Sequence, residues 1–397
     1  MSASTAMTRL AITPPRWLVR PRDVDPVMAI CALILLALGA VMVASASITV
    51  AARELGDPWH YLFRQLTFIG LGLGLAAVIV QIPLARWQQL ALPLLLAGLA
   101  LLALVLVPGF GRTVNGSTRW LELGVIGFQV SEAAKLAVLL YLADYSVRRR
   151  DQLVASWGGF LRPLVLVGIG AVLLLMEPDF GAAVVLVATA MAVLFLGGVP
   201  LSRFLLLALV ATAGVIALAL SSPYRVERIS AFLDPWADPF DSGFQLTQSL
   251  IAVGSGGWTG VGLGGSVQKL FYLPEGHTDF LFAIFAEEMG LIGVLAVIAL
   301  FVVLIGRAFG ISARADRAGL GFGALLSVGI GVWLALQAFI NAGVNMGLLP
   351  TKGLTLPLMS YGGSSTLVMC AAIGLLLRVE RETALTTRHA QRRRSES

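Results

Sequence analysis

Charged residues are scarce in this chain of 397 residues: Asp, Glu, Lys and Arg make up only 13% of it, whereas 58% of the residues are apolar. Soluble domains carry about 25% charged residues. A chain with a mean hydropathy of +0.88 has too little polar surface to cover one large soluble core. The composition therefore excludes a set of soluble domains and predicts a polytopic membrane protein.

Cysteine and histidine are also scarce. The two cysteines, Cys31 and Cys370, lie inside apolar runs, which argues against a disulfide framework. The three histidines, His60, His277 and His389, lie far apart in the sequence and lack the spacing of a zinc site.

Several motifs of soluble enzymes are missing. The chain contains no Gly-x-Ser-x-Gly, no phosphate-binding Walker loop and no His-Glu-x-x-His. The missing Walker loop argues against a mechanism driven by ATP hydrolysis. Gly260-x-Gly262-x-x-Gly265 matches the dinucleotide-binding pattern, but no parallel-strand context accompanies it, and we reject that interpretation.

Long apolar runs are abundant. A helix needs roughly 20 apolar residues to cross about 30 Å of hydrocarbon. We therefore expect an all-α fold with ten transmembrane helices and both termini on one side. The predicted helices are residues 27–46, 64–80, 88–107, 130–145, 162–176, 180–197, 203–221, 280–306, 320–343 and 361–378.

Basic residues indicate the orientation. The side that receives both tails and the alternate loops holds most of the Lys and Arg, so it is expected to be cytoplasmic. The chain then divides into a cytoplasmic tail (1–26), a membrane domain (27–378) and a basic cytoplasmic tail (379–397). The net charge of +6 is assigned to membrane lipids and not to nucleic acid.

The longest loop, residues 222–279, lies on the opposite side between the seventh and eighth predicted helices. Val226, Ile229, Phe232 and Leu233 recur in it at helical spacing, which predicts a short helix in the membrane interface. The size of this loop places the expected chemistry outside the cytoplasm.

Polar residues inside predicted helices need a reason, because burying them in hydrocarbon is costly. Glu132 and Lys135 lie three residues apart on one helix face. Two interpretations stay open: an interfacial cap with a neutralising ion pair, or the charged wall of a cavity. Glu287 and Glu288, two turns below Asp279, are expected to make polar contacts in the core.

A row of amide side chains follows the ninth predicted helix. Gln337, Asn341 and Asn345 recur every four residues, and we favour hydrogen bonding between helices as their role.

Polar residues also crowd the start of the eighth predicted helix, where His277, Thr278 and Asp279 precede Phe280. Thr278 or Asp279 could simply cap that helix, or the cluster could be catalytic. Further along, the Pro-Thr-Lys-Gly and Ser-Tyr-Gly-Gly segments offer a cation and backbone amides, groups that suit a phosphate.

These loops resemble one known family along residues 25–378. The resemblance is carried by GRTVNGSTRWLELG, FQVSEAAKLA, EPDFGAA, QKLFYLPEGHTDF and LLPTKGLTLPLMSYGGSS, which are similar to segments of the SEDS family (shape, elongation, division and sporulation). Within the family, the loop sequences are closer to the division members than to the elongation members. The chain departs from the usual pattern with Val130 in place of proline and Glu177 in place of glutamine.

The resemblance implies a ten-helix SEDS fold with interfacial helices in a large periplasmic loop. It also implies a peptidoglycan glycosyltransferase that polymerises lipid II on the periplasmic side during septal wall synthesis. That reaction forms β-1,4 linkages with inversion and releases undecaprenyl diphosphate. The family's catalytic aspartate falls on Asp279, and its functional residues in the fourth helix and the Pro-Thr-Lys-Gly loop fall on Glu132, Lys135 and Lys352.

The chemistry accounts for one carboxylate together with several cations. A sugar hydroxyl is a poor nucleophile unless a positioned carboxylate takes its proton, and a diphosphate leaving group needs electrostatic stabilisation. We therefore assign Asp279 as the base. A bridging Mg²⁺ or Mn²⁺ is compatible with the diphosphate, with no ligands assigned. The candidate substrate-binding residues are Glu132, Lys135, Lys352, Arg112, Arg119, His277 and Ser360.

Two other functions stay open from the sequence, a lipid II flippase and a non-catalytic scaffold of the division machinery. By resemblance, the expected partners are the transpeptidase FtsI, the FtsQ-FtsL-FtsB complex and FtsN. The expected location is the inner membrane at the division septum.

Overall fold

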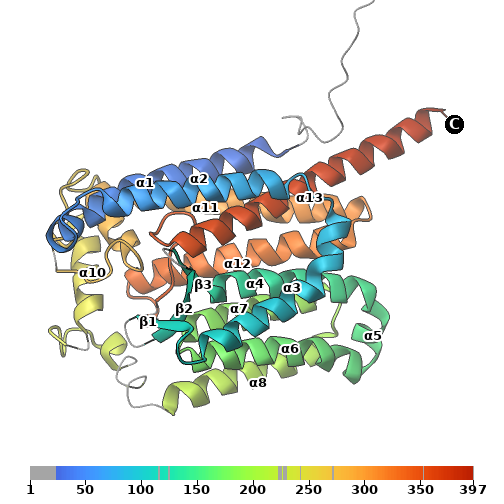
Figure 1. Ribbon diagram of the computed structural model, residues 1–397, viewed down its shortest axis with the longest axis horizontal. Helices are drawn as coiled ribbons and strands as arrows, with labels where there is room; N and C mark the ends of the chain where they lie inside the picture. The colour runs from blue at the N-terminus through green and yellow to red at the C-terminus, as the bar shows by residue number, and fades with distance from the viewer. Residues whose placement is uncertain are drawn as a thin grey trace, which may run out of the picture.

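Long helices lying side by side form the body of the protein in the computed structural model (Figure 1). The structure describes residues 24–396 except 115–116, 124–125, 222–225, 227–229, 242, 271 and 352. The helices are α1 (Pro26–Glu54), α2 (His60–Ile79), α3 (Leu84–Val105), α4 (Val130–Arg148), α5 (Arg150–Ala155), α6 (Trp157–Met176), α7 (Phe180–Leu196), α8 (Leu201–Leu220), α10 (Phe244–Ser255), α11 (Leu281–Arg317), α12 (Gly321–Asn345) and α13 (Gly363–Glu396).

Each of the ten predicted apolar runs falls on a separate helix, with ends that differ by a few residues at most positions. Among the described residues, seven helices are long and apolar enough to cross a membrane, namely α1, α2, α3, α6, α11, α12 and α13. α7 and α8 contain shorter apolar stretches. The tenth predicted run lies in α13, which continues as a helix to Glu396 and projects from the body (Figure 1).

α4 covers a predicted span, but it belongs neither to these seven helices nor to the two helices with shorter apolar stretches. It carries Glu132, Lys135 and Asp144 and buries most of its side chains, because α3, α7, α12 and α13 pack around it. A helix enclosed by other helices does not need an apolar surface, and its polar groups can pair inside the bundle. α4 is therefore the polar centre of the bundle.

The fold is mostly helical, as expected, but one end of the bundle also contains a small sheet that was not predicted. Strands β1 (Gly111–Val114), β2 (Ser117–Leu123) and β3 (Ile126–Gln129) form an antiparallel sheet in the order β1-β2-β3. The sequence signal was present, because the Asn-Gly dipeptide between the first two strands favours a two-residue hairpin. We call this end of the bundle the sheet end (Figure 1).

The predicted helix over residues 280–306 is present as part of α11, and it contains a kink that the sequence analysis did not predict. α11 is interrupted at Gly290, whose φ of +63° and ψ of −168° belong to a region open essentially to glycine alone. The preceding loop fills the kink: the Leu291 amide donates to the Gly257 carbonyl at 2.9 Å. A Cβ on Gly260 would lie 2.1 Å from the Glu288 carbonyl oxygen. The glycine-rich stretch from Gly254 to Gly265 therefore has a packing role at this kink.

Glu287 and Glu288 make the polar core contacts that the sequence predicts. Glu288 Oε1 lies 2.7 Å from Lys269 Nζ and accepts a hydrogen bond from Ser45 Oγ at 2.7 Å. Glu287 Oε1 accepts from the Val267 amide at 3.0 Å. The two glutamates thus fasten the loop that leads to Asp279 onto α1 and α11.

The predicted interfacial helix is described only in part. Residues 230–233 are helical, whereas Ile229 lies outside the described residues. Sequence analysis missed α10, which crosses one end of the bundle (Figure 1). Ser249 Oγ on α10 donates to the Asn345 carbonyl at 2.8 Å, which ties α10 to the end of α12.

The turn between α6 and α7 buries a carboxyl group. The side chain of Glu177 is fully buried, and neither of its carboxyl oxygens has a hydrogen-bond partner within the described part of the chain. Burial, and then the nearby Asp179 carboxylate, raise the pKa of Glu177 to about 8, against the opposing effect of Arg119. Glu177 is therefore expected to be largely protonated at neutral pH.

The raised pKa predicts a pH-dependent stability that Glu177→Gln removes. The folded state binds the Glu177 proton more tightly than the unfolded state, so this stabilisation is complete below about pH 4.5 and is lost as the pH rises through about 8. Glutamine does not titrate, so the melting temperature of Glu177→Gln should rise relative to that of wild type as the pH increases. Between pH 6 and pH 9 the difference should shift in favour of the variant by at least about 2 °C, measured by thermal unfolding in detergent.

Asp57→Asn serves as the control, because Asp57 is an exposed carboxylate. It should leave the difference in melting temperature between pH 6 and pH 9 as in wild type. An unchanged pH response in Glu177→Gln would show that the Glu177 carboxyl group does not titrate in the folded protein over this range.

Candidate functional site

Asp279 ends the loop that precedes α11 and lies two residues before the first residue of that helix. The N-cap of α11 is Phe280, and the Thr278 hydroxyl donates to Glu275 Oε2 at 2.6 Å. The helix therefore begins after the polar cluster, and capping does not account for these residues. The Asp279 side chain is half-buried.

The backbone of Asp279 is fixed from α12. Its carbonyl oxygen accepts hydrogen bonds from Asn341 Nδ2 at 2.9 Å and from Asn345 Nδ2 at 3.0 Å. Asn345 Oδ1 in turn accepts from the Ala283 amide, in the first turn of α11, at 3.0 Å. Two buried amide side chains therefore hold the segment on which the Asp279 carboxylate is mounted.

We name Gln337, Asn341 and Asn345 the amide row of α12. All three side chains are buried, and their spacing of four residues puts them on one helix face. The predicted hydrogen bonding between elements is confirmed. The bonds also reach loops, because Asn341 Nδ2 donates to the Leu354 carbonyl at 2.6 Å and Gln337 Nε2 donates to the Thr355 carbonyl at 3.2 Å.

The loop after α12 approaches the Asp279 carboxylate at Gly353. A Cβ added to Gly353 would lie 3.2 Å from Asp279 Oδ2 and 3.9 Å from Arg119 Nη1. Asp279 of the loop before α11, Arg119 of β2 and the loop after α12 therefore meet at one point. Lys352, the residue before Gly353, lies outside the described residues, and its assignment stays a prediction.

Arg119 is oriented by a hydroxyl group and a carboxylate from other parts of the chain. Its Nε donates to Ser117 Oγ at 2.6 Å, and its Nη1 lies 3.7 Å from Asp179 Oδ2. Asp179 also caps α7 by accepting from the Ala182 amide at 3.1 Å. The turn between α6 and α7 thus helps to position a cation of the sheet, a role that sequence analysis did not assign to Asp179.

Glu132 and Lys135 form a buried ion pair. Lys135 Nζ lies 2.8 Å from Glu132 Oε1, and both side chains are at most 5% exposed. Lys135 also lies over the Trp333 ring, 5.2 Å from its centroid, and donates to Gln337 Oε1 at 3.2 Å. The pair therefore lies inside the bundle, and an interfacial cap does not describe it.

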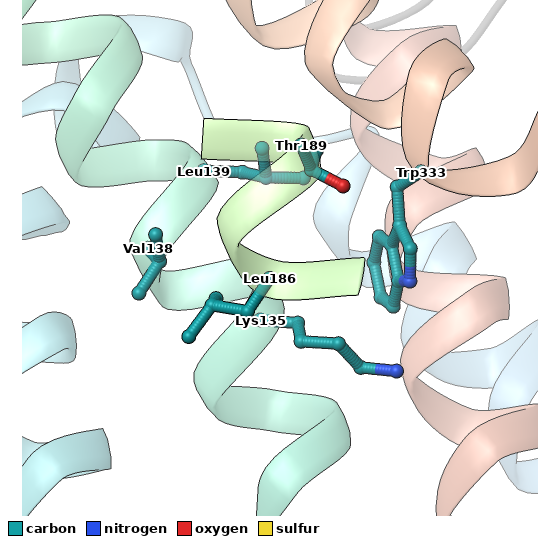
Figure 2. A pocket seen from close by; sticks show the side chains of 6 residues that line it. All are labelled: Lys135, Val138, Leu139, Leu186, Thr189 and Trp333. Carbon is teal, nitrogen blue, oxygen red and sulfur yellow. The ribbon is translucent and has the colours of Figure 1, made fainter. Parts of the chain in front are cut away.

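A pocket lies beside Lys135, between α4, α7 and α12 (Figure 2). In this conformation it is too narrow to admit a water molecule. Figure 2 shows the Lys135 side chain extending toward Trp333. The lining side chains are Lys135, Val138, Leu139, Leu186, Thr189 and Trp333.

His277 lies two residues before Asp279, and its ring packs against two tyrosine rings. Its ring centroid lies 4.7 Å from that of Tyr61 and 5.6 Å from that of Tyr361, and its carbonyl accepts from the Tyr361 amide at 3.0 Å. Burial lowers the pKa of His277, so the ring is expected to be neutral at pH 7. His277 therefore links the Asp279 loop to the segment before α13.

Two predicted substrate-binding residues have different surroundings. Ser360 is buried, and its Oγ accepts from the Leu356 amide at 2.9 Å, so its hydroxyl stabilises a turn. Arg112 is exposed on β1, paired in register with Trp120 of β2. The structure thus brings Asp279, Arg119 and Gly353 together and links Lys135 to them through the amide row.

Comparison with known proteins identifies the same architecture elsewhere. The chain is 60% identical over 356 residues to the "Probable peptidoglycan glycosyltransferase FtsW" of Thioalkalivibrio sulfidiphilus, covering 90% of this chain and 89% of that protein. It is 58% identical over 352 residues to the protein of the same name from Nitrosococcus halophilus, covering 89% of this chain and 91% of that protein.

Solved structures agree with this. A chain of a peptidoglycan synthase complex that couples polymerisation and crosslinking matches with a TM-score of 0.75 and 34% identity, over 91% of this chain and 98% of that one. The rod shape determining protein RodA of Thermus thermophilus matches with a TM-score of 0.68 and 33% identity, over 93% of this chain and 99% of that one.

A family model described as a cell cycle protein matches residues 25–385. That span runs from the start of α1 well into α13, so it includes the ion pair, the amide row and Asp279. The chain is a multi-pass membrane protein and belongs to the FtsW/RodA/SpoVE family, the SEDS family that its loops resemble.

Proposed function

We propose that the chain is a peptidoglycan glycosyltransferase that polymerises lipid II into β-1,4-linked glycan strands during septal wall synthesis. The observation that carries this proposal is the meeting of the Asp279 carboxylate with Arg119 and Gly353 at the sheet end. A general base beside cationic and backbone groups is the set that this reaction requires. The names of the relatives support the same activity.

In the proposed reaction, the 4-hydroxyl of one saccharide attacks the anomeric carbon of another. Asp279 takes the hydroxyl proton as the new carbon–oxygen bond forms and the bond to the diphosphate oxygen breaks. The product is inverted at that carbon, and undecaprenyl diphosphate leaves. The hydrogen bonds from Asn341 and Asn345 to the Asp279 carbonyl support this role, because a base must be held in one position.

The leaving diphosphate is proposed to be stabilised by cations from separate elements. Arg119 of β2, Lys135 of α4 and Lys352 are the candidates, and Glu132 holds Lys135 until the substrate enters. The pocket beside Lys135 is closed in this conformation, so binding of lipid II is proposed to open it between α4, α7 and α12. Arg112 and His277 are proposed to contact the substrate at the edge of the same site.

A divalent cation fits this site as a companion of the substrate. Mg²⁺ is commonly held by one or two carboxylates together with substrate phosphates, and Asp279 offers one half-buried carboxylate. When bound, such an ion would supply additional charge stabilisation for the diphosphate.

The membrane arrangement is also proposed. Ten helices are proposed to span the inner membrane, with both termini in the cytoplasm and residues 222–279 on the periplasmic side at the division septum. The proposed main partner is a transpeptidase such as FtsI. The similar chain in a peptidoglycan synthase complex supports such a partner, and FtsQ-FtsL-FtsB and FtsN are proposed as further partners.

Asp279→Asn tests the base. The amide has nearly the same shape but cannot accept the hydroxyl proton, so we expect polymerisation of labelled lipid II to fall by about 10²–10⁴-fold. The measurement is the glycan ladder formed by purified protein with its transpeptidase partner. Asp57→Asn, which changes an exposed carboxylate, should retain wild-type ladders.

Other outcomes would change the proposal. Polymerisation by Asp279→Asn at the wild-type rate would remove the base assignment and would favour a scaffold. Movement of the lipid II headgroup across liposomes that depends on Asp279, without glycan product, would favour a flippase.

Lys135→Met tests the cation inside the bundle. Removing the ammonium leaves the Glu132 carboxylate buried without its partner, which typically costs about 3–5 kcal/mol of stability. The double variant Glu132→Gln with Lys135→Met should recover most of this stability, because no unpaired buried charge remains. It should still polymerise poorly, since the diphosphate lacks its cation. Melting temperature and glycan ladders measured on the three proteins separate the two effects, and full activity of the double variant would contradict this role.

A further inference from the structure

Gln337 lies between the two parts of the proposed active site. Its side chain is fully buried and is the first of the three in the amide row. On one side it contacts the Glu132–Lys135 ion pair, and on the other it contacts the loop after α12. No other residue described in the structure is recorded with hydrogen bonds to both Lys135 and that loop.

The orientation of the Gln337 amide is determined by three hydrogen bonds. Oε1 accepts from Lys135 Nζ at 3.2 Å and from Trp333 Nε1 at 2.8 Å, and both of these partners can only donate. Nε2 donates to the Thr355 carbonyl at 3.2 Å. A flipped amide would turn its NH₂ group toward two donors and its oxygen toward a carbonyl, so only this orientation satisfies all three partners.

The neighbouring residue of the amide row continues the connection. Asn341 Nδ2 donates to the Leu354 carbonyl at 2.6 Å and to the Asp279 carbonyl at 2.9 Å. Consecutive carbonyls of the loop, those of Leu354 and Thr355, are therefore held by consecutive members of the row. Directly before them lies Gly353, against which Asp279 Oδ2 packs.

We propose that Gln337 is a positioning residue that couples the place of Lys135 to the place of residues 353–355, and through them to the Asp279 carboxylate. The inference rests on the proposed function, in which Lys135 moves toward the diphosphate. When Lys135 leaves Gln337 Oε1, the amide loses one of the bonds that orient it, and its hold on Thr355 weakens. Binding of the leaving group at Lys135 is thereby communicated to the loop beside the base.

The competing interpretation is that Gln337 only fills space in the bundle. A space-filling residue would affect thermal stability and the amount of folded protein. It would not change turnover of bound substrate, and it would not make the loop at 353–355 respond to a substitution at Lys135. The test therefore measures turnover and loop protection in addition to stability.

The first measurement is steady-state polymerisation of lipid II by Gln337→Met, a variant of similar length without hydrogen-bonding groups. We expect kcat to fall by about 10²-fold, the loss that a misplacement near 1 Å can cause. KM should change by less than about threefold, because the substrate contacts remain. The matched control is Ser327→Ala on the same helix. Ser327 is fully buried, and its hydroxyl has no hydrogen-bond partner among the described residues, so this variant should retain wild-type kcat.

The second measurement needs no turnover and guards against a poorly folded Gln337 variant. It follows amide hydrogen exchange of peptides that cover residues 353–361 in detergent-purified protein. Lys135→Met does not alter Gln337 itself, yet it should raise exchange in this segment, and Gln337→Met should raise it at least as much. Ser327→Ala should leave it at the wild-type level.

The outcomes are distinct. A wild-type kcat in Gln337→Met, or unchanged exchange at 353–361 in Lys135→Met, would overturn the coupling. Neither result would contradict the proposed polymerase function, as long as the wild-type protein forms glycan. A wild-type protein that forms no glycan with its transpeptidase partner would overturn the proposed function and the coupling together. Reduced kcat with raised exchange in both variants would support the coupling.

Discussion

The arrangement of the site depends on the hydrogen bonds that α12 makes with its amide row. A buried amide in a helical bundle has no water to satisfy it, so an unmade hydrogen bond is costly. The NH₂ groups of Asn341 and Asn345 meet this requirement by donating to the Asp279 carbonyl, and the NH₂ group of Gln337 meets it by donating to the Thr355 carbonyl. Because these buried amides must make hydrogen bonds, they hold the loop before α11 and the loop after α12 against α12.

A second anchor holds the loop before α11. The kink at Gly290 exposes backbone groups of α11, and the glycine-rich stretch satisfies them: the Gly262 amide donates to the Glu288 carbonyl at 3.1 Å. The buried pair of Lys269 and Glu288 then ties the residues that follow this stretch to α11. The loop is therefore fastened at the kink and again at Asp279. The break in α11 and the placement of the loop before it therefore depend on the same contacts.

Periodic features were predictable from the sequence, whereas features that depend on distant contacts were not. Apolar runs located the helices, and a spacing of three or four residues identified the Glu132–Lys135 pair and the amide row. The kink at Gly290 could not be predicted, because a glycine inside an apolar helix looks the same whether or not a loop docks against it. The closeness of Arg119 to Asp279 joins segments far apart in the chain, and no local spacing encodes it. The sheet had a local signal, the Asn-Gly turn, but its strands are too short to produce a clear alternation.

The distribution of charge accounts for how the cations of the site are held in place before a substrate binds. Arg119 is shared with Ser117 and Asp179, and Lys135 is paired with Glu132, so each cation has an acceptor in the folded protein. A buried charge without a partner is costly, and these acids remove that cost while the site holds no substrate. In the proposed reaction the leaving diphosphate carries more charge than a single carboxylate, so both cations can turn to it when lipid II binds. Glu132 and Asp179 therefore position the cations of the site until the leaving group replaces them as the acceptor.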